Sequence, residues 1–155
     1  MIGSCPDPAP SGKTRPTMNI QRASGLLLHP TSLPGGHGIG DMGPAARTFL
    51  ADMQAAGQSV WQILPLAPTS LGNSPYSALS SFAGNPLLIS FDDLVRDGFA
   101  DAGILSGLPD NAAERVDYDG VATGKLAALD IVAGDFLKRS SQDEEWGDFE
   151  LFRAR

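Results

Sequence analysis

The sequence predicts an α/β fold that is built on one parallel β-α-β unit. Three observations carry this prediction: an apolar run at 26–28, a helical pattern that begins at Pro44, and a second apolar run at 60–64. A strand, a helix and a strand of these lengths form a parallel unit with a right-handed crossover. Both strands are continuous apolar runs, which is typical of a sheet that is buried on both faces.

The first strand and the helix have recognisable ends. His29 and Pro30 follow the first strand, and the proline ends it because proline cannot donate to a sheet ladder. Pro44 suits the first position of the helix, since its φ is already set. Gly57 is expected to end the helix in a left-handed conformation. The apolar residues at helical spacing between these ends are Ala46, Phe49, Leu50 and Met53.

A long connection follows the second strand. The segment 65–86 is rich in Pro, Ser and Gly, and loops of this length are usually functional. The residues 87–90 then predict a short extended piece. Ser90 with Asp93 resembles the start of a helix that ends at Gly98.

A longer amphipathic helix is predicted over 119–137, although three internal glycines weaken it. The acidic residues 143–145 and the residues 149–155 resemble the middle of an element, since no helix cap or turn signal marks an end there. The apolar stripe expected on the helix consists of Leu126, Leu129, Ala133, Phe136 and Leu137.

Composition limits the class of protein. The 155 residues are 42% hydrophobic, which suits one globular domain, and the net charge of −7 argues against binding to nucleic acid or to anionic membranes. Cys5 is the only cysteine, so a disulfide framework is excluded and a reducing compartment is the simpler interpretation. No apolar run reaches transmembrane length, and we expect a cytoplasmic protein with no membrane partner. The Pro-rich residues 1–21 predict a disordered extension, within which Met18 is an alternative start.

Polar side chains follow both predicted strands. His29, Thr31 and Ser32 come after the first strand. Because the carboxyl ends of parallel strands meet at one edge of a sheet, these residues are expected to share a site with the loop after the second strand. The alternative is that Pro and Ser merely end the two strands. The polar residues of the second loop are Ser74, Tyr76, Ser77 and Asn85.

Tyr76 is the best single binding candidate in this loop. An aromatic ring can stack on the apolar face of a sugar, and the hydroxyl group supplies a polar contact. Pro75 stiffens the backbone before the ring. The alternative is a tyrosine that packs beneath a loop. Phe82 and Trp61 have no polar neighbours in the sequence, and we assign both to packing.

Other site types have weaker support. Residues 38–43 match G-x-G-x-x-G before a helix, which is typical of nucleotide binding, but the match begins well after the first strand and no acidic residue follows the second. His29, His37 and Asp41 have no standard metal-ligand spacing, so no metal site is predicted. A hydrolase triad of Ser32, His29 and Asp41 lacks a nucleophile elbow.

The small number of carboxyl groups limits which sugar chemistry the chain could catalyse. Glycosyl transfer with retention of configuration needs two carboxyl groups, one as nucleophile and one as acid/base. No glutamate precedes Glu114, and Asp41 is the only acid in the stretch that looks like a site. Asp92 and Asp93 are sufficiently explained as helix-start residues. A complete catalytic pair is therefore not expected in this chain.

A set of motifs, dense over 25–92, resembles the beginning of the 4-α-glucanotransferases of glycoside hydrolase family 77. A weaker later signature is Val116–Tyr118 followed by Lys125. The motifs are SGLLLHPTSLP at 24–34, GIGD at 38–41, GQ at 57–58 with WQ at 61–62 and LPL at 64–66, SPY at 74–76 and FAGNP at 82–86.

The resemblance implies an (α/β)₈ barrel with inserted subdomains that transfers α-1,4-glucan segments through a covalent glycosyl-enzyme, without a cofactor. Its nucleophilic Asp and acid/base Glu lie on later strands, so no catalytic residue is assigned here. Ser74 and Tyr76 match positions that line the donor-sugar site, and the partner implied is a maltooligosaccharide or another α-1,4-glucan. His29, Asp41 and Asn85 match positions that shape the loops.

This resemblance implies a division of the chain. After the extension at 1–21, residues 22–92 would form the first strands and helix of the barrel, and 93–155 the start of a helical insertion. A barrel of eight strands needs about 250 residues. We therefore expect an amino-terminal fragment that is unstable and inactive on its own. The alternatives are a non-catalytic glucan-binding module and, less favoured, a nucleotide-binding domain.

Overall fold

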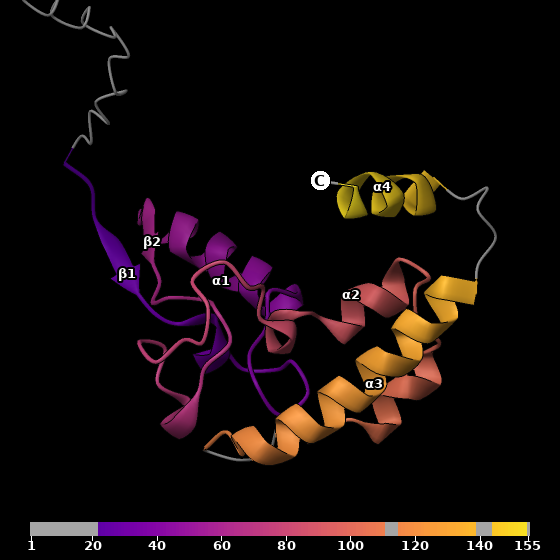
Figure 1. Ribbon diagram of the computed structural model, residues 1–155. Coiled ribbons are helices and arrows are strands. Elements are labelled where there is room, and N and C mark those ends of the chain that lie inside the picture. Colours follow the sequence, from indigo (N-terminus) through magenta and orange to yellow (C-terminus); the bar gives the residue numbers. More distant parts are fainter. Residues whose placement is uncertain (1–21, 111–114, 139–143, 155) are drawn as a thin grey trace, which may run out of the picture.

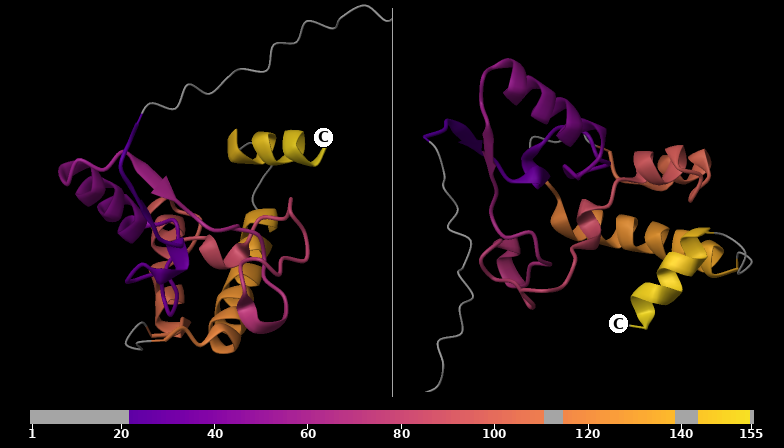
Figure 2. Two further views of the ribbon diagram at one scale, coloured as in Figure 1. Left: turned by 90° about the vertical axis from the view of Figure 1, so that its left-hand side faces the viewer. Right: turned by 90° about the horizontal axis from the view of Figure 1, so that it is seen from above.

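The computed structural model describes residues 22–110, 115–138 and 144–154 (Figure 1). The expected disordered extension and the alternative start at Met18 lie outside these residues. A small sheet and helix α1 lie on one side of the molecule, and α3 and α4 lie on another (Figure 2).

The sheet consists of β1 (Gly25–Leu27) and β2 (Val60–Gln62), which pair in parallel with Leu26 opposite Trp61. Helix α1 (Pro44–Ala55) connects them. The predicted parallel β-α-β unit is therefore confirmed, although β1 begins one residue before its apolar run and β2 is shorter than its run. The ladder continues for one more bond, in which Leu28 N–H donates to the carbonyl oxygen of Gln62 at 3.1 Å.

The expectation that both strands are buried is wrong for the described part of the chain. Leu27 is 58% exposed and Val60 is 44% exposed. An apolar strand is buried on both faces only when other elements cover the sheet on both sides. In the described residues the sheet has two strands, so both of its edges lack a neighbouring strand.

Helix α1 packs on the sheet through an aromatic pair. The rings of Phe49 and Trp61 lie 5.2 Å apart in an edge-to-face arrangement, and the indole N–H of Trp61 donates to the carbonyl oxygen of Leu28 at 2.8 Å. Trp61 therefore packs as expected. Gly57, with a φ of 72°, follows the helix in the predicted left-handed conformation.

Helix α2 (Phe91–Arg96) begins as the sequence predicts. The hydroxyl oxygen of Ser90 accepts the backbone N–H of Asp93 at 3.3 Å. The extended piece expected at 87–90 is correct for Ile89 and Ser90, but its first half belongs to a turn of 3₁₀ helix, η3 (Pro86–Leu88), capped by the side chain of Asn85. Proline suits the first position of such a turn, and the asparagine satisfies the Leu87 N–H, so together they outweigh the apolar pattern.

Helix α3 (Tyr118–Lys138) confirms the predicted long helix but presents a different face to the core. Leu126 and Leu137 of the expected stripe are about half exposed. The buried residues lie instead at i, i+4, i+7 and i+11: Val121, Lys125, Ala128 and Val132. The expected stripe is correct in part, because Leu129 packs against the core, but it left out Lys125, which hydropathy does not place in a core.

The main core lies between α2, α3 and the 3₁₀ helix η4 (Ala102–Gly107), with Phe91 at its centre and fully buried. Helix α4 (Glu144–Arg153) was not predicted from the sequence. It contacts the end of α3 through aromatic rings. The ring centroid of Phe136 lies 5.7 Å from that of Trp146 and 5.6 Å from that of Phe149.

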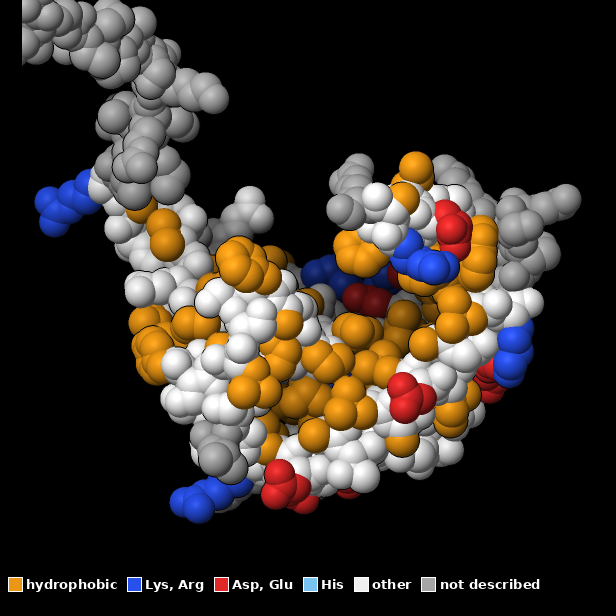
Figure 3. All heavy atoms as spheres, in the orientation of Figure 1, with side chains coloured by type: hydrophobic (Ala, Val, Ile, Leu, Met, Phe, Trp, Pro, Cys, Tyr) orange, Lys and Arg blue, Asp and Glu red, His pale blue; other side chains and the backbone are white. Residues whose placement is uncertain are grey.

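Much of the apolar surface remains exposed. Figure 3 shows hydrophobic side chains gathered in a hollow between the loop after β2 and α3, below α4. Phe82 is 99% exposed, so its assignment to packing is wrong for the described chain. No helix in the described ranges combines the length and the apolar character that crossing a membrane requires.

Candidate functional site

The loops after β1 and β2 meet around a cavity of about 200 Å³. The first loop contributes His29, Thr31, Ser32 and Ile39, and α3 contributes Tyr118 from its first turn. This convergence agrees with the prediction that polar groups after successive parallel strands share one site. The second loop contributes Leu64, Pro65, Ala67, Thr69, Asn73, Pro75, Asn85 and Leu87.

His29 connects the two loops. Its Nδ1 accepts the backbone N–H of Thr31 at 3.3 Å and lies 2.7 Å from the hydroxyl oxygen of the same threonine. Because Nδ1 is an acceptor, the ring proton is assigned to Nε2, which donates to the carbonyl oxygen of Pro65 at 3.3 Å. The histidine therefore caps the 3₁₀ turn η1 (Pro30–Ser32) and holds it beside the end of β2.

The second loop is a small folded unit. Its ends pair in an antiparallel bridge between Thr69 and Ala78, next to a 2.8 Å hydrogen bond from Ser70 N–H to the carbonyl oxygen of Ser77. At its turn Asn73 has a φ of 52°, a left-handed conformation that asparagine tolerates better than most residues. These contacts fix the backbone on either side of the S-P-Y motif.

Ser74 and Tyr76 flank this cavity and do not line it. Pro75, which lies between them, is the lining residue. The hydroxyl oxygen of Ser74 lies 3.4 Å from the backbone N–H of Tyr76, which donates to it, and the tyrosine is 75% exposed. The alternative of a tyrosine that packs beneath a loop does not fit this exposure. The ring of Tyr76 is therefore largely open to solvent, next in sequence to the lining residue Pro75.

Asn85 lines the cavity and shapes its wall. Its side-chain oxygen accepts the backbone N–H of Leu87 at 3.0 Å, and its carbonyl oxygen accepts the N–H of Leu88 at 3.1 Å. These bonds define the turn η3 that follows the second loop.

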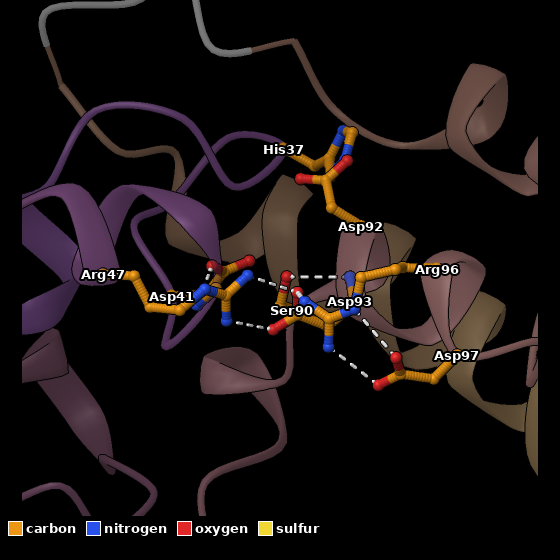
Figure 4. Close-up of polar contacts among 9 residues, drawn as sticks. His37, Asp41, Arg47, Ser90, Asp92, Asp93, Arg96 and Asp97 are labelled. Carbon is orange, nitrogen blue, oxygen red and sulfur yellow. Dashed lines mark hydrogen bonds and ion pairs between the residues drawn. The ribbon is translucent and has the colours of Figure 1, made fainter.

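Asp41 lies beneath the loops and outside the cavity, and it is 1% exposed. One carboxylate oxygen accepts the N–H of Gly43 at 2.9 Å, and the other lies 3.6 Å from Nζ of the fully buried Lys125. Burial raises the pKa of Asp41 and lowers the pKa of Lys125, because both charges have lost their water. Figure 4 shows this carboxylate beside Ser90, with His37 and Asp92 facing each other nearby.

The glycine motif serves packing. A Cβ atom on Gly38 would lie 2.7 Å from Val121 and 2.9 Å from Pro109. The α1 N-terminus, where a pyrophosphate would bind, is instead next to the carboxylate of Asp41. These contacts leave nucleotide binding without support at this loop.

The described residues offer no metal centre and no catalytic pair in this cavity. Across residues 22–110, 115–138 and 144–154, no three His, Cys, Asp or Glu side chains gather as metal ligands. None of the described side chains that line the cavity is a carboxylate. The described lining therefore lacks the two carboxyl groups that a retaining glycosyl transfer needs.

Two residues near the site had no role in the sequence-based prediction. Tyr118 lines the cavity, and Lys125 lies behind it, 2.9 Å from the carbonyl oxygen of Leu87. The signal that could have found them is the later signature, Val116–Tyr118 followed by Lys125, which places the two residues about two turns apart on one helix.

Comparisons with known proteins agree with this geometry. Residues 28–155 match the glycoside hydrolase 77 family, described as 4-alpha-glucanotransferase. The 4-alpha-glucanotransferase of Synechocystis is 54% identical over 147 residues, which cover 86% of this chain and 29% of the relative. That of Thermus thermophilus is 43% identical over 141 residues, covering 89% of this chain and 27% of the relative.

A solved structure gives the same result. The amylomaltase of Streptococcus agalactiae, determined in complex with acarbose, superposes with a TM-score of 0.74 at 37% identity and covers 86% of this chain and 27% of its own. The chain thus spans less than a third of the length of these proteins. The motifs, the family match and the shared fold establish that the chain belongs to the 4-alpha-glucanotransferases of glycoside hydrolase family 77.

Proposed function

We propose that the protein transfers segments of α-1,4-glucan between maltooligosaccharides or starch chains, through a retaining covalent glycosyl-enzyme. Membership of the family supports this activity. The acarbose in the S. agalactiae amylomaltase supports an α-glucan oligosaccharide as ligand. The observation that carries the proposal is the convergence of the loops after β1 and β2 on one cavity, held together by His29.

Within such an enzyme, this chain supplies one wall of the donor-sugar site. Tyr76 stacks on a sugar ring and Ser74 contacts the same sugar, since both lie at the rim and the tyrosine is exposed. His29 and Asn85 hold the two loops in place, and Asp41 supports the first loop from beneath. β1 and β2 are proposed as the first two strands of a (β/α)₈ barrel, with α3 in an inserted subdomain.

The catalytic carboxyl groups lie elsewhere in this proposal. A retaining pair stands about 5 to 5.5 Å apart across the sugar. Because no carboxylate is among the described lining residues, we place the nucleophilic Asp and the acid/base Glu on strands other than β1 and β2. No cofactor enters this chemistry, and we propose a cytoplasmic location, which the acidic composition and the lone Cys5 support.

A disproportionation assay tests this proposal. The protein expressed from its complete reading frame is incubated with maltotriose, and the expected products are glucose and longer maltooligosaccharides. The 155-residue chain alone is assayed beside it, and no transfer is expected from that sample. Transfer by the chain alone would contradict the placement of the carboxyl groups. Absence of transfer by both samples, with acarbose still bound, would favour the non-catalytic glucan-binding module.

A further inference from the structure

Lys125 is fully buried in the middle of α3, where its ammonium group faces two other segments. It donates to the carbonyl oxygen of Leu87 at 2.9 Å and lies 3.6 Å from the carboxylate of Asp41. It also lies 5.7 Å from the ring centroid of Phe91. One side chain of the helix therefore contacts both the segment after β1 and the turn after the second loop.

The hydrogen bond between Lys125 and Leu87 is linked to the cavity. Leu87 lines the cavity, and its N–H is held by the side chain of Asn85, another lining residue. The carbonyl group of Leu87 is held from behind by Lys125. The turn η3 is thus fixed from the cavity side by Asn85 and from the opposite side by the lysine.

The contact between Lys125 and Asp41 is linked to the first loop. Asp41 accepts the N–H of Gly43 at the start of α1, and the neighbouring Gly40 N–H donates to the carbonyl oxygen of Thr31 at 3.2 Å. Thr31 lines the cavity. Lys125 therefore stands behind both loops that form the cavity.

Packing alone does not account for a lysine at this position. Burying a charge is costly, and a buried ion pair replaced as a whole by apolar side chains often gives an equally stable or more stable core, whereas removing one partner alone leaves the other charge unpaired. The ammonium group is therefore best explained by the two polar contacts that it makes, both of which fix loop backbone. A methionine would fill the same volume but would make neither contact.

We propose that Lys125 is a positioning residue that holds the two sugar-binding loops in a fixed position relative to helix α3. This inference rests on the proposed function, because the loops are taken to bind the donor sugar. When the lysine is replaced, the carboxylate of Asp41 loses its charge partner and the turn η3 loosens, so the sugar site loses part of its preorganisation.

The test compares Lys125→Met with Lys138→Met in the protein expressed from its complete reading frame. Lys138 is a matched control, since it lies on the same helix, is 79% exposed and pairs only with Asp135 among the described residues. For Lys125→Met, KM for maltotriose is expected to rise about tenfold with kcat nearly unchanged, because ground-state and transition-state binding are lost together. For Lys138→Met, neither parameter is expected to change.

A second readout does not depend on transfer activity. Hydrogen–deuterium exchange in the peptide 84–90 is expected to become about tenfold faster in Lys125→Met and to stay unchanged in Lys138→Met. If the unsubstituted protein transfers no glucan, the proposed function fails, while this exchange readout still tests the inference. Unchanged exchange and unchanged KM in a folded Lys125→Met protein would overturn it.

A folding control completes the test. Lys125→Gln keeps a polar group at the position and is examined by the same cooperative melt as Lys125→Met. If both variants fail to fold, the lysine supports the whole structure and the positioning role is overturned. If either variant folds, its KM and exchange rate decide the question.

Discussion

Arg47 and Asp93 form a bidentate ion pair that joins α1 to α2 (Figure 4). The two guanidinium nitrogens of Arg47 donate to the two carboxylate oxygens of Asp93 at 2.8 and 2.6 Å. Arg96 adds a third bond to the same carboxylate at 2.6 Å. Asp93 therefore has two roles, since it also stands in the first turn of α2, where a negative charge is favourable.

This arrangement predicts an acid-dependent loss of stability. The hydrogen bond from Arg47, followed by the charges of Arg47 and Arg96, holds the pKa of Asp93 below its usual 3.8. The unfolded chain therefore binds the proton first, so the stabilisation is present above about pH 4 and is lost as the pH falls through the lower, folded-state pKa. Asp93→Asn should flatten this fall in stability at acid pH, as measured by urea melts of the protein expressed from its complete reading frame.

Arg47→Met serves as the partner experiment, because it removes the same ion pair from the other side. Arg47→Met should flatten the fall in stability less than Asp93→Asn does, because Arg96 still donates to the carboxylate, and the double variant should add little to Asp93→Asn. If the free energy of unfolding falls as steeply at acid pH in Asp93→Asn as in the unsubstituted chain, Asp93 is not the group responsible.

His29 gives a prediction with two separable parts. His29→Ala removes both the cap on Thr31 and the bond to Pro65, and should destabilise the chain by about 1 to 2 kcal/mol. His29→Asn can still cap Thr31 but is too short to reach Pro65. It should recover about half of the lost stability while binding acarbose as weakly as His29→Ala does. Denaturant melts measure the first effect and titration calorimetry the second.

Gly38 tests whether the glycine motif serves packing. Gly38→Ala places a Cβ atom against Val121 and Pro109 at a φ of 88°, and should destabilise the chain by about 2 to 3 kcal/mol. Gly57→Ala is the matched control, because its φ is 72° but nothing lies within 4 Å of the added atom. It should cost only the backbone strain, about 1 kcal/mol. Equal losses in the two variants would show that Gly38 has no packing role.

The part of the fold that the sequence predicted is the part that local rules decide. Pro44 and Gly57 mark the ends of α1, and Ser90 marks the start of α2, through contacts within a few residues. The convergence of His29 and Asn85 on one cavity followed from the parallel order of the strands.

The failures concern residues whose environment is set by distant parts of the chain. Lys125 was not among the residues expected to face the core, yet Asp41 and Leu87, far away in sequence, provide partners that allow it to be buried. Phe82 was expected to pack, yet no described residue covers it. Hydropathy describes whether a side chain prefers water or an apolar environment. Whether the side chain is buried depends on which distant segments of the chain pack against it.

Tyr76 provides the most direct test of the sugar site. If its exposed ring stacks on the donor sugar, Tyr76→Ala should weaken acarbose binding about tenfold, because an aromatic contact of that size is lost. Tyr76→Phe should keep most of the affinity, since the ring remains. Phe82→Ala is the matched control: it removes an aromatic ring that is 99% exposed in the same connection but does not line the cavity. Titration calorimetry of the protein from its complete reading frame measures all three. Equal affinity in Tyr76→Ala and Phe82→Ala would remove Tyr76 from the site and leave the cavity beside Pro75 as the place where the sugar binds.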